Sequence, residues 1–139
     1  AGNVVCVDTL NFLMESFRTY GNDLMEGMIP VDYYRASLDK VAREYRLVQK
    51  RQGVGHHQPD AHFAELIMAT GNDLMTKRKF RDAALVYHIS LEFNPLSPLT
   101  YEALSRAYLL SGNSAMAQKY TRRSKELTRN PTLFIVGEN

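Results

Sequence analysis

A cluster of side chains that could hold a metal ion lies within seven residues of the chain. It consists of His56, His57, Asp60 and His62. Imidazole nitrogens and carboxylate oxygens are common zinc ligands, and histidine also titrates near neutral pH. The spacing matches no established metal motif, however, and the neighbouring Gly53, Gly55 and Pro59 are typical of a loop. A metal-binding protein that uses the His56–His62 loop is therefore a remote alternative, and we expect no metal and no cofactor.

Covalent catalysis has little support in the sequence. There is no Gly-x-Ser-x-Gly elbow and no glycine-rich phosphate loop. Cys6 is the single cysteine, so an intrachain disulfide is impossible, and no histidine lies near it in the sequence. We interpret Cys6 as a small apolar residue near a helix start. We therefore expect no catalytic residue in this chain.

The charges exclude some classes of partner. The 139 residues include 17 Lys and Arg against 15 Asp and Glu, a net charge of +2. Nucleic-acid binding requires a larger basic excess, so we interpret the basic clusters at 77–81 and 122–125 as solvated faces. The eight tyrosines fall mostly on apolar stripes and are assigned to the core. No apolar run approaches the ~18 residues that a membrane span needs. The compartment stays open.

The spacing of apolar residues predicts about six helices and almost no strand, hence an all-α fold. The first helix carries apolar residues from Val7 to Phe17 and is expected to begin at Asp8 and end at Gly21. The second follows Pro30 and has a one-sided apolar stripe from Tyr34 to Val48. Four more helices are expected at about 60–77, 80–93, 98–110 and 114–128.

The last four predicted helices form two repeats of 34 residues, 64–97 and 98–131. The repeats align Ala83 with Ala117, Ser90 with Ser124, Glu92 with Glu126, Leu74 with Tyr108, Phe93 with Leu127 and Ile67 with Tyr101. This pattern resembles the tetratricopeptide repeat. The second repeat departs from it, with Ser105 in place of the usual first-helix glycine and Pro131 two residues late. The resemblance implies antiparallel helix hairpins stacked as a short right-handed α-solenoid.

The pentapeptide Gly-Asn-Asp-Leu-Met occurs twice, at 21–25 and at 71–75. The copies are 50 residues apart, which is no multiple of 34. Gly71 is followed twelve residues later by Ala83, whereas Gly21 is followed at that distance by Tyr33. We therefore interpret the first copy as a coincidence or as the remnant of an ancestral unit that does not continue into a repeat.

The repeat resemblance implies a concave groove that binds a peptide or protein. In this chain the groove positions are Glu65, Met68, Asn72, Met75, Glu102, Arg106 and Leu109. A clamp for a terminal carboxylate, present in some members, is not supported, because Met68 stands where a lysine is needed and Ala103 where a second asparagine is needed. An alternative is that these residues face a neighbouring domain or the first two helices, since two repeats alone make a shallow groove.

The chain divides into three predicted parts. Residues 1–59 form a helical pair that caps the repeats, 60–131 form two repeats, and 132–139 form an apolar tail. We expect Leu133 to Val136 to dock on an exposed face or on a second subunit, which allows a homodimer. Because the chain does not begin with Met, we expect it to be a piece of something longer.

The run of helices and loops is similar to the helical C-terminal extension of bacterial putative esterases of the α/β-hydrolase family. The residues that carry this likeness are Thr9-Leu10, Phe17, Tyr20, Tyr34, Ser37-Leu38, Tyr45, Gly53 and Pro59. The resemblance implies that a catalytic domain lay upstream, because this chain has no nucleophile elbow and no histidine before His56. The expected function is a non-catalytic domain for protein–protein or interdomain contact, with a stand-alone peptide-binding adaptor as the alternative.

Overall fold

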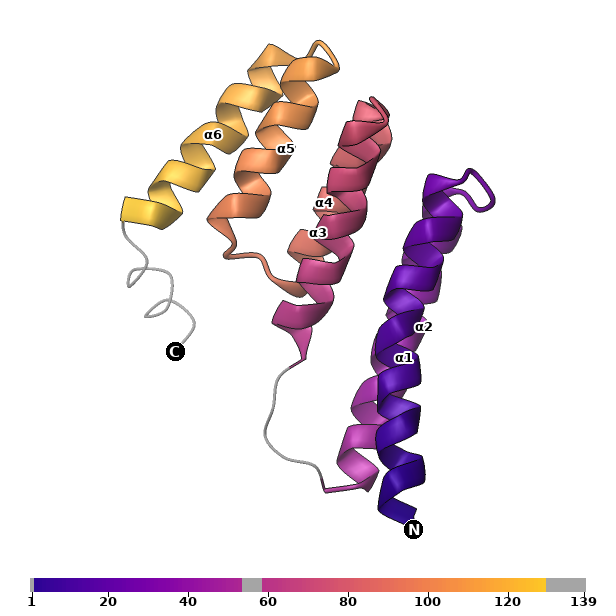
Figure 1. Ribbon diagram of the computed structural model, residues 1–139. Coiled ribbons are helices and arrows are strands. Elements are labelled where there is room, and N and C mark those ends of the chain that lie inside the picture. The colour runs from indigo at the N-terminus through magenta and orange to yellow at the C-terminus, as the bar shows by residue number, and fades with distance from the viewer. Residues whose placement is uncertain (1, 54–58, 130–139) are drawn as a thin grey trace.

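The computed structural model describes residues 2–53 and 59–129, with the side chains from residue 9 onward, as six α-helices and no strand. Figure 1 shows that they run up and down as a row of three helix pairs. The helices are α1 (Gly2–Met25), α2 (Val31–Arg51), α3 (Asp60–Thr76), α4 (Phe80–Phe93), α5 (Pro98–Leu110) and α6 (Ser114–Arg129). The expected all-α stack of antiparallel hairpins is therefore confirmed.

The predicted ends of α1 were wrong at both termini. The helix begins before Asp8 and continues through Gly21 to Met25. Glycine often ends a helix, but Gly21 has another role here: a Cβ at this position would lie 2.3 Å from Oγ1 of Thr70 in α3. Glycine is therefore present because two helices approach closely, and the turn comes six residues later at Gly27.

The first helix of each hairpin ends with the same hydrogen-bond pattern. In each, one residue has a left-handed backbone: Gly27 (φ 76°), Arg78 (φ 62°) and Gly112 (φ 90°). The N–H of this residue donates to the carbonyl three residues before it. The N–H of the following residue donates to the carbonyl five residues before it, as Met28 does to Asp23. The α1–α2 hairpin therefore shares this helix ending with the α3–α4 and α5–α6 hairpins.

Equivalent hydrogen bonds mark the two predicted repeats. The hydroxyl of Ser90 in α4 donates to the carbonyl of Ala64 in α3 (2.8 Å). One period later, Ser124 in α6 donates to the carbonyl of Pro98 in α5 (3.0 Å). Both serines are buried, so small side chains let the paired helices meet and their hydroxyl groups are satisfied by backbone. The 34-residue register is therefore present in the contacts as well as in the sequence.

The two pentapeptide copies occupy the same place in successive hairpins. Each lies at the end of a first helix, with the glycine and leucine buried, the asparagine exposed and the methionine half-buried. The hairpin after the first copy has a longer turn and a longer second helix, 21 residues in α2 against 14 in α4. The greater length of this hairpin contributes to the 50-residue separation, and the origin of the first copy from an ancestral unit stays a hypothesis.

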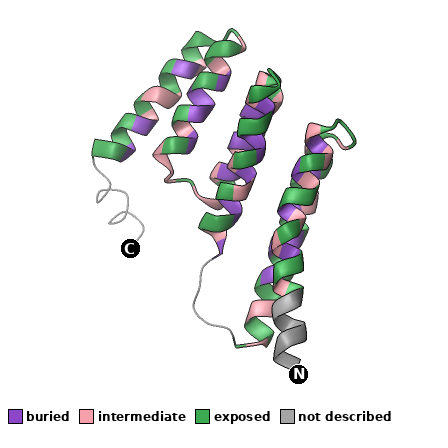
Figure 2. Cartoon of the chain, viewed as in Figure 1, coloured by how far each residue is buried: buried purple, intermediate pink, exposed green. Residues whose placement is uncertain are grey.

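Aromatic rings join the first hairpin to the second. Phe17 of α1 stacks on Phe63 of α3, with ring centroids 4.5 Å apart. Phe93 of α4 and Tyr45 of α2 meet Phe63 edge-on, at 5.9 and 5.3 Å. Buried residues occur in all six helices and alternate with exposed ones (Figure 2). These ring contacts hold the first hairpin against the second.

The hairpins are joined in two different ways. The first joins the second mainly through α1 against α3, whereas the second joins the third mainly through α4 against α5. The first and second hairpins are therefore placed side by side in a different way from the second and third. As a result, α3 and α5 lie on one side of the molecule with a hollow between them.

Candidate functional site

Five of the seven predicted groove residues surround one hollow between α3 and α5, hereafter the α3–α5 groove. Met68, Asn72 and Met75 come from α3, and Glu102 and Arg106 come from α5. The full lining comprises these five with Thr76, Tyr87, Leu99 and Ala103. No residue of α1 or α2 takes part, so the alternative that the groove residues pack on the first two helices does not describe this lining.

A hydrogen bond between Tyr87 and Asn72 lies at the floor of the groove. The buried phenol of Tyr87 donates a hydrogen bond to Oδ1 of Asn72 (2.6 Å). Its ring lies against Gly71, where an added Cβ would be 2.5 Å from a ring carbon. Burial raises the pKa of Tyr87 to about 12, with a smaller opposing effect of Arg106 and a raising effect of Asp73. The phenol therefore stays protonated and holds Asn72, whose exposed amide N–H groups can face a ligand.

The walls combine apolar and charged groups. Met68 and Met75 are half-buried, and Leu99 is 66% exposed at the rim. Glu102 and Arg106 are exposed one helical turn apart on α5, and neither forms an ion pair within the described residues. Adaptable thioethers beside an unpaired carboxylate and guanidinium suit a chain segment with mixed side chains.

The remaining two predicted groove residues lie elsewhere. Glu65 is at the other end of α3, where its carboxylate is 3.7 Å from Nδ1 of His62. Leu109 lies beside Ser105 and Gln118 on the face that α5 and α6 turn away from the other hairpins. Both positions follow the first-helix register, but the groove extends over only the part of α3 and α5 where the helices face each other.

Sequence reasoning missed two groove residues that matter. The sequence assigns Tyr87 to the core with the other tyrosines, although its hydroxyl lies at the groove floor. Leu99 lies in the first turn of α5 and is not among the groove positions that the sequence predicts. A signal for Tyr87 existed, because the buried Gly71 in the preceding helix leaves room for one large polar ring.

The structure describes only Asp60 and His62 of the metal-like cluster. His56 and His57 lie outside the described residues. The carboxylate of Asp60 accepts a hydrogen bond from Arg46 (2.7 Å), and His62 faces Glu65. Over 2–53 and 59–129, no group of three histidine, cysteine or acidic side chains is placed to hold a metal. The side chain of Cys6 and the apolar tail at 132–139 also lie outside the described part.

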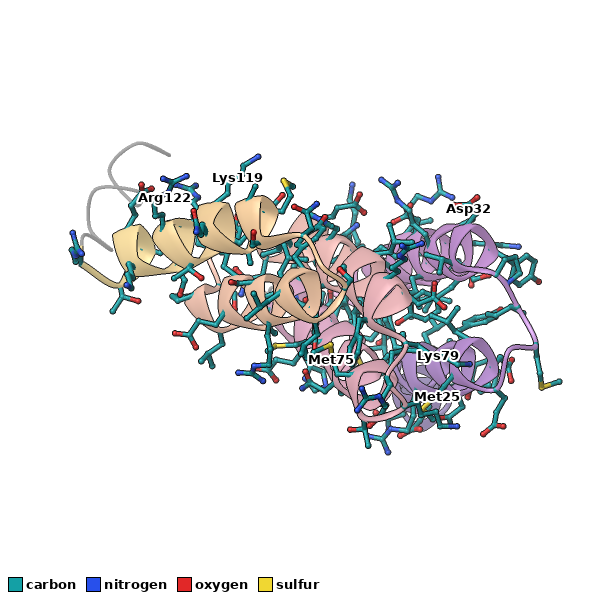
Figure 3. The ribbon with its side chains drawn as sticks, turned by 90° about the horizontal axis from the view of Figure 1, so that it is seen from above. Met25, Asp32, Met75, Lys79, Lys119 and Arg122 are labelled. Atoms are coloured by element: carbon teal, nitrogen blue, oxygen red, sulfur yellow. The ribbon has the colours of Figure 1, made fainter. Side chains whose placement is uncertain are left out.

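The basic cluster at 77–81 ties the first two hairpins together. Nζ of Lys79 donates to the carbonyl of Met25 (3.4 Å), and Lys77 lies 4.0 Å from the carboxylate of Glu26. Figure 3 shows Lys79 beside Met25. This cluster therefore has contacts beyond the solvated face that we expected.

The described helices include none with the length and apolar character to cross a membrane, as expected. Comparisons with known proteins give no match to a family model, to a curated protein or to a solved structure. The tetratricopeptide and esterase resemblances therefore stay predictions from the sequence.

Proposed function

We propose that this chain is a non-catalytic helical-repeat domain that binds a peptide segment in the α3–α5 groove. The segment comes from a protein partner or from another domain of the same protein, such as an upstream esterase domain. The observation that carries the proposal is the convergence of Met68, Asn72, Met75, Glu102 and Arg106 on one groove, with Tyr87 fixing Asn72 from below.

The chemistry of the groove fits a peptide better than a small substrate. The lining of the groove has no nucleophile paired with a base, and its titratable groups are an exposed carboxylate, an exposed guanidinium and the buried phenol of Tyr87. An amide side chain held by a buried phenol can bond the main chain of a peptide, while Met68 and Met75 accept apolar side chains.

The test is a selection of peptides from a random display library on the immobilised chain, with affinities measured by fluorescence polarisation. In the groove variant, Glu102→Arg and Arg106→Glu exchange the two charges and leave the net charge unchanged. A matched control exchanges Asp39 and Arg43, which are exposed and have the same spacing on α2.

We expect selected peptides to lose about tenfold or more in affinity for the groove variant and to bind the control as they bind the original chain. Selected peptides that bind the groove variant unchanged contradict the proposal, and so does a library that yields no binder. Circular dichroism of both variants verifies that each stays folded.

A further inference from the structure

A second surface lies on the side of the molecule away from the α3–α5 groove. Figure 3 shows Lys119 and Arg122 of α6 on the side opposite Met75. A shallow hollow there is lined by Tyr101, Lys119, Tyr120, Arg122, Arg123 and Glu126. We call these six residues the aromatic–basic surface.

The tyrosine rings of this surface are held in a column. Tyr120 of α6 stacks between Tyr108 and Tyr101 of α5, with centroid distances of 5.6 and 6.0 Å and interplanar angles of 11° and 19°. His88 of α4 meets Tyr108 and Tyr120 edge-on, and its Nε2 lies 2.9 Å from the hydroxyl of Tyr108. The hydroxyl of Tyr101 donates to the carbonyl of Pro95 (3.0 Å). Contacts from three helices therefore fix the rings.

The fixed rings position the cationic groups. Nζ of Lys119 lies 5.4 Å from the centroid of Tyr120, and the guanidinium carbon of Arg123 lies 5.8 Å from that of Tyr101. At these distances, cation and ring attract each other. Arg122 is exposed beside them. The single carboxylate of the surface, Glu126, is 3.6 Å from Arg123, so three cations face one anion.

The charge of the chain is concentrated here. Helix α6 has five basic residues, Lys119, Arg122, Arg123, Lys125 and Arg129, and one acidic residue, Glu126. Its formal charge of +4 exceeds the +2 of the whole chain, so the rest of the molecule is net acidic. Charge complementarity with α6 therefore selects an anionic partner, in contrast to the mixed charges of the α3–α5 groove.

We propose that the aromatic–basic surface binds an acidic peptide segment, one with several Asp or Glu side chains close together. Arginine can pair with a carboxylate through two parallel hydrogen bonds, and a run of carboxylates can engage the exposed Lys119 and Arg122 at once. A nucleic acid fits less well, because the chain outside α6 has a net negative charge, which disfavours binding along a long phosphate chain.

The experiment measures fluorescence anisotropy of a labelled deca-glutamate peptide with the full chain at low and at physiological salt. A deca-glutamine peptide and a labelled oligothymidylate serve as the neutral and nucleic-acid probes. The surface variant combines Lys119→Glu with Arg122→Glu, two exposed positions. The control variant combines Arg43→Glu with Lys50→Glu on α2, which are exposed and change the net charge equally.

We expect deca-glutamate to bind more weakly as salt rises, and to lose about tenfold or more in affinity for the surface variant but not for the control. Deca-glutamine should not bind. Equal losses in both variants, an unchanged surface variant, or tighter binding of oligothymidylate than of deca-glutamate would each overturn the proposal. The charge exchange at Glu102 and Arg106 should leave deca-glutamate binding unchanged, so this result is separate from that of the α3–α5 groove.

Discussion

One position in the first helix of each hairpin faces a closely packed neighbouring helix. The residues at this position are Gly21, Gly71 and Ser105. Gly21 leaves room for Thr70 of the next hairpin, and Gly71 leaves room for the ring of Tyr87. Ser105 keeps a side chain, and its buried hydroxyl donates to the carbonyl of Ala117 (2.7 Å). The residue at each position therefore fits the group that the neighbouring helix places there, which is a threonine side chain, a tyrosine ring or a backbone carbonyl.

Replacing Gly71 by Ala tests this interpretation through the sign of the effect. In a helix without close neighbours, Gly→Ala stabilises by about 1 kcal/mol. Here the new Cβ would lie 2.5 and 2.8 Å from two carbons of the Tyr87 ring, so the ring must move and its bond to Asn72 is disturbed. We expect a net loss of about 1–3 kcal/mol in urea unfolding followed by circular dichroism. A stabilised variant would contradict the close contact.

The stability of the chain should depend on pH through His88. Burial lowers the pKa of this imidazole from 6.5, and the charge of Lys119 lowers it further. A folded-state pKa below the unfolded one means that stability is complete above pH 6.5 and falls as the pH drops through 6.5 towards the folded-state value.

The comparison for this prediction is the variant His88→Gln, which keeps a polar group facing Tyr108 but does not titrate. Urea unfolding between pH 5 and 8 should be less pH-dependent for the variant than for the original chain. The other histidines are unchanged, so the difference isolates His88. Identical pH profiles would show that His88 titrates alike in the folded and unfolded states.

Among the elements, α3 to α6 could be predicted to within about two residues, whereas α1 could not. Turn and cap residues fix the later ends: the hydroxyl of Ser97 accepts the N–H of Thr100, and Pro98 occupies the first turn of α5. In α1, Gly21 is interpreted as a helix end because the sequence alone does not show that Thr70 of α3 packs against it. The helical pair of the first hairpin could be predicted, but its similarity to the other two could not, because its lengthened second helix, α2, breaks the 34-residue period.

Overpacking the crossing within each repeat hairpin tests the repeat register. Ala83 in α4 and Ala117 in α6 are buried and equivalent by the 34-residue spacing. Ala83→Leu and Ala117→Leu should each lower the free energy of unfolding by about 1–3 kcal/mol, because the added side chain must separate the paired helices. Ala69→Leu is the control, since Ala69 is exposed on α3. Thermal melts that match the original chain at both buried positions would rule out the register.

At the scale of the molecule, the groove could be predicted from the first-helix register, but its extent could not. The register placed Met68 and Arg106 on one face, and the structure brings them together. It could not show that Leu109 lies beyond the groove, since this depends on how α5 sits against α4. The aromatic–basic surface was missed because Tyr101 and Tyr120 had been assigned to the core, although both are half-exposed.

Phe17 is central to the aromatic contacts between the first hairpin and the second. Its fully buried ring stacks on Phe63 and meets Phe93 edge-on at 6.3 Å. Phe17→Ala leaves a cavity where three helices meet and should cost about 3–5 kcal/mol in urea unfolding. Phe12→Ala on the same helix is the matched control, because Phe12 is 72% exposed and its loss should cost less than about 0.5 kcal/mol.

Amide hydrogen exchange shows where the loss caused by Phe17→Ala is felt. The third hairpin joins the second through α4 and α5, away from Phe17. We therefore expect exchange to accelerate most in α1 and α2, while α5 and α6 keep more of their protection, since stacked hairpins interact mainly with their neighbours. A uniform acceleration in all six helices would mean that the hairpins unfold as one unit, and that the aromatic contact at Phe17 supports the whole stack.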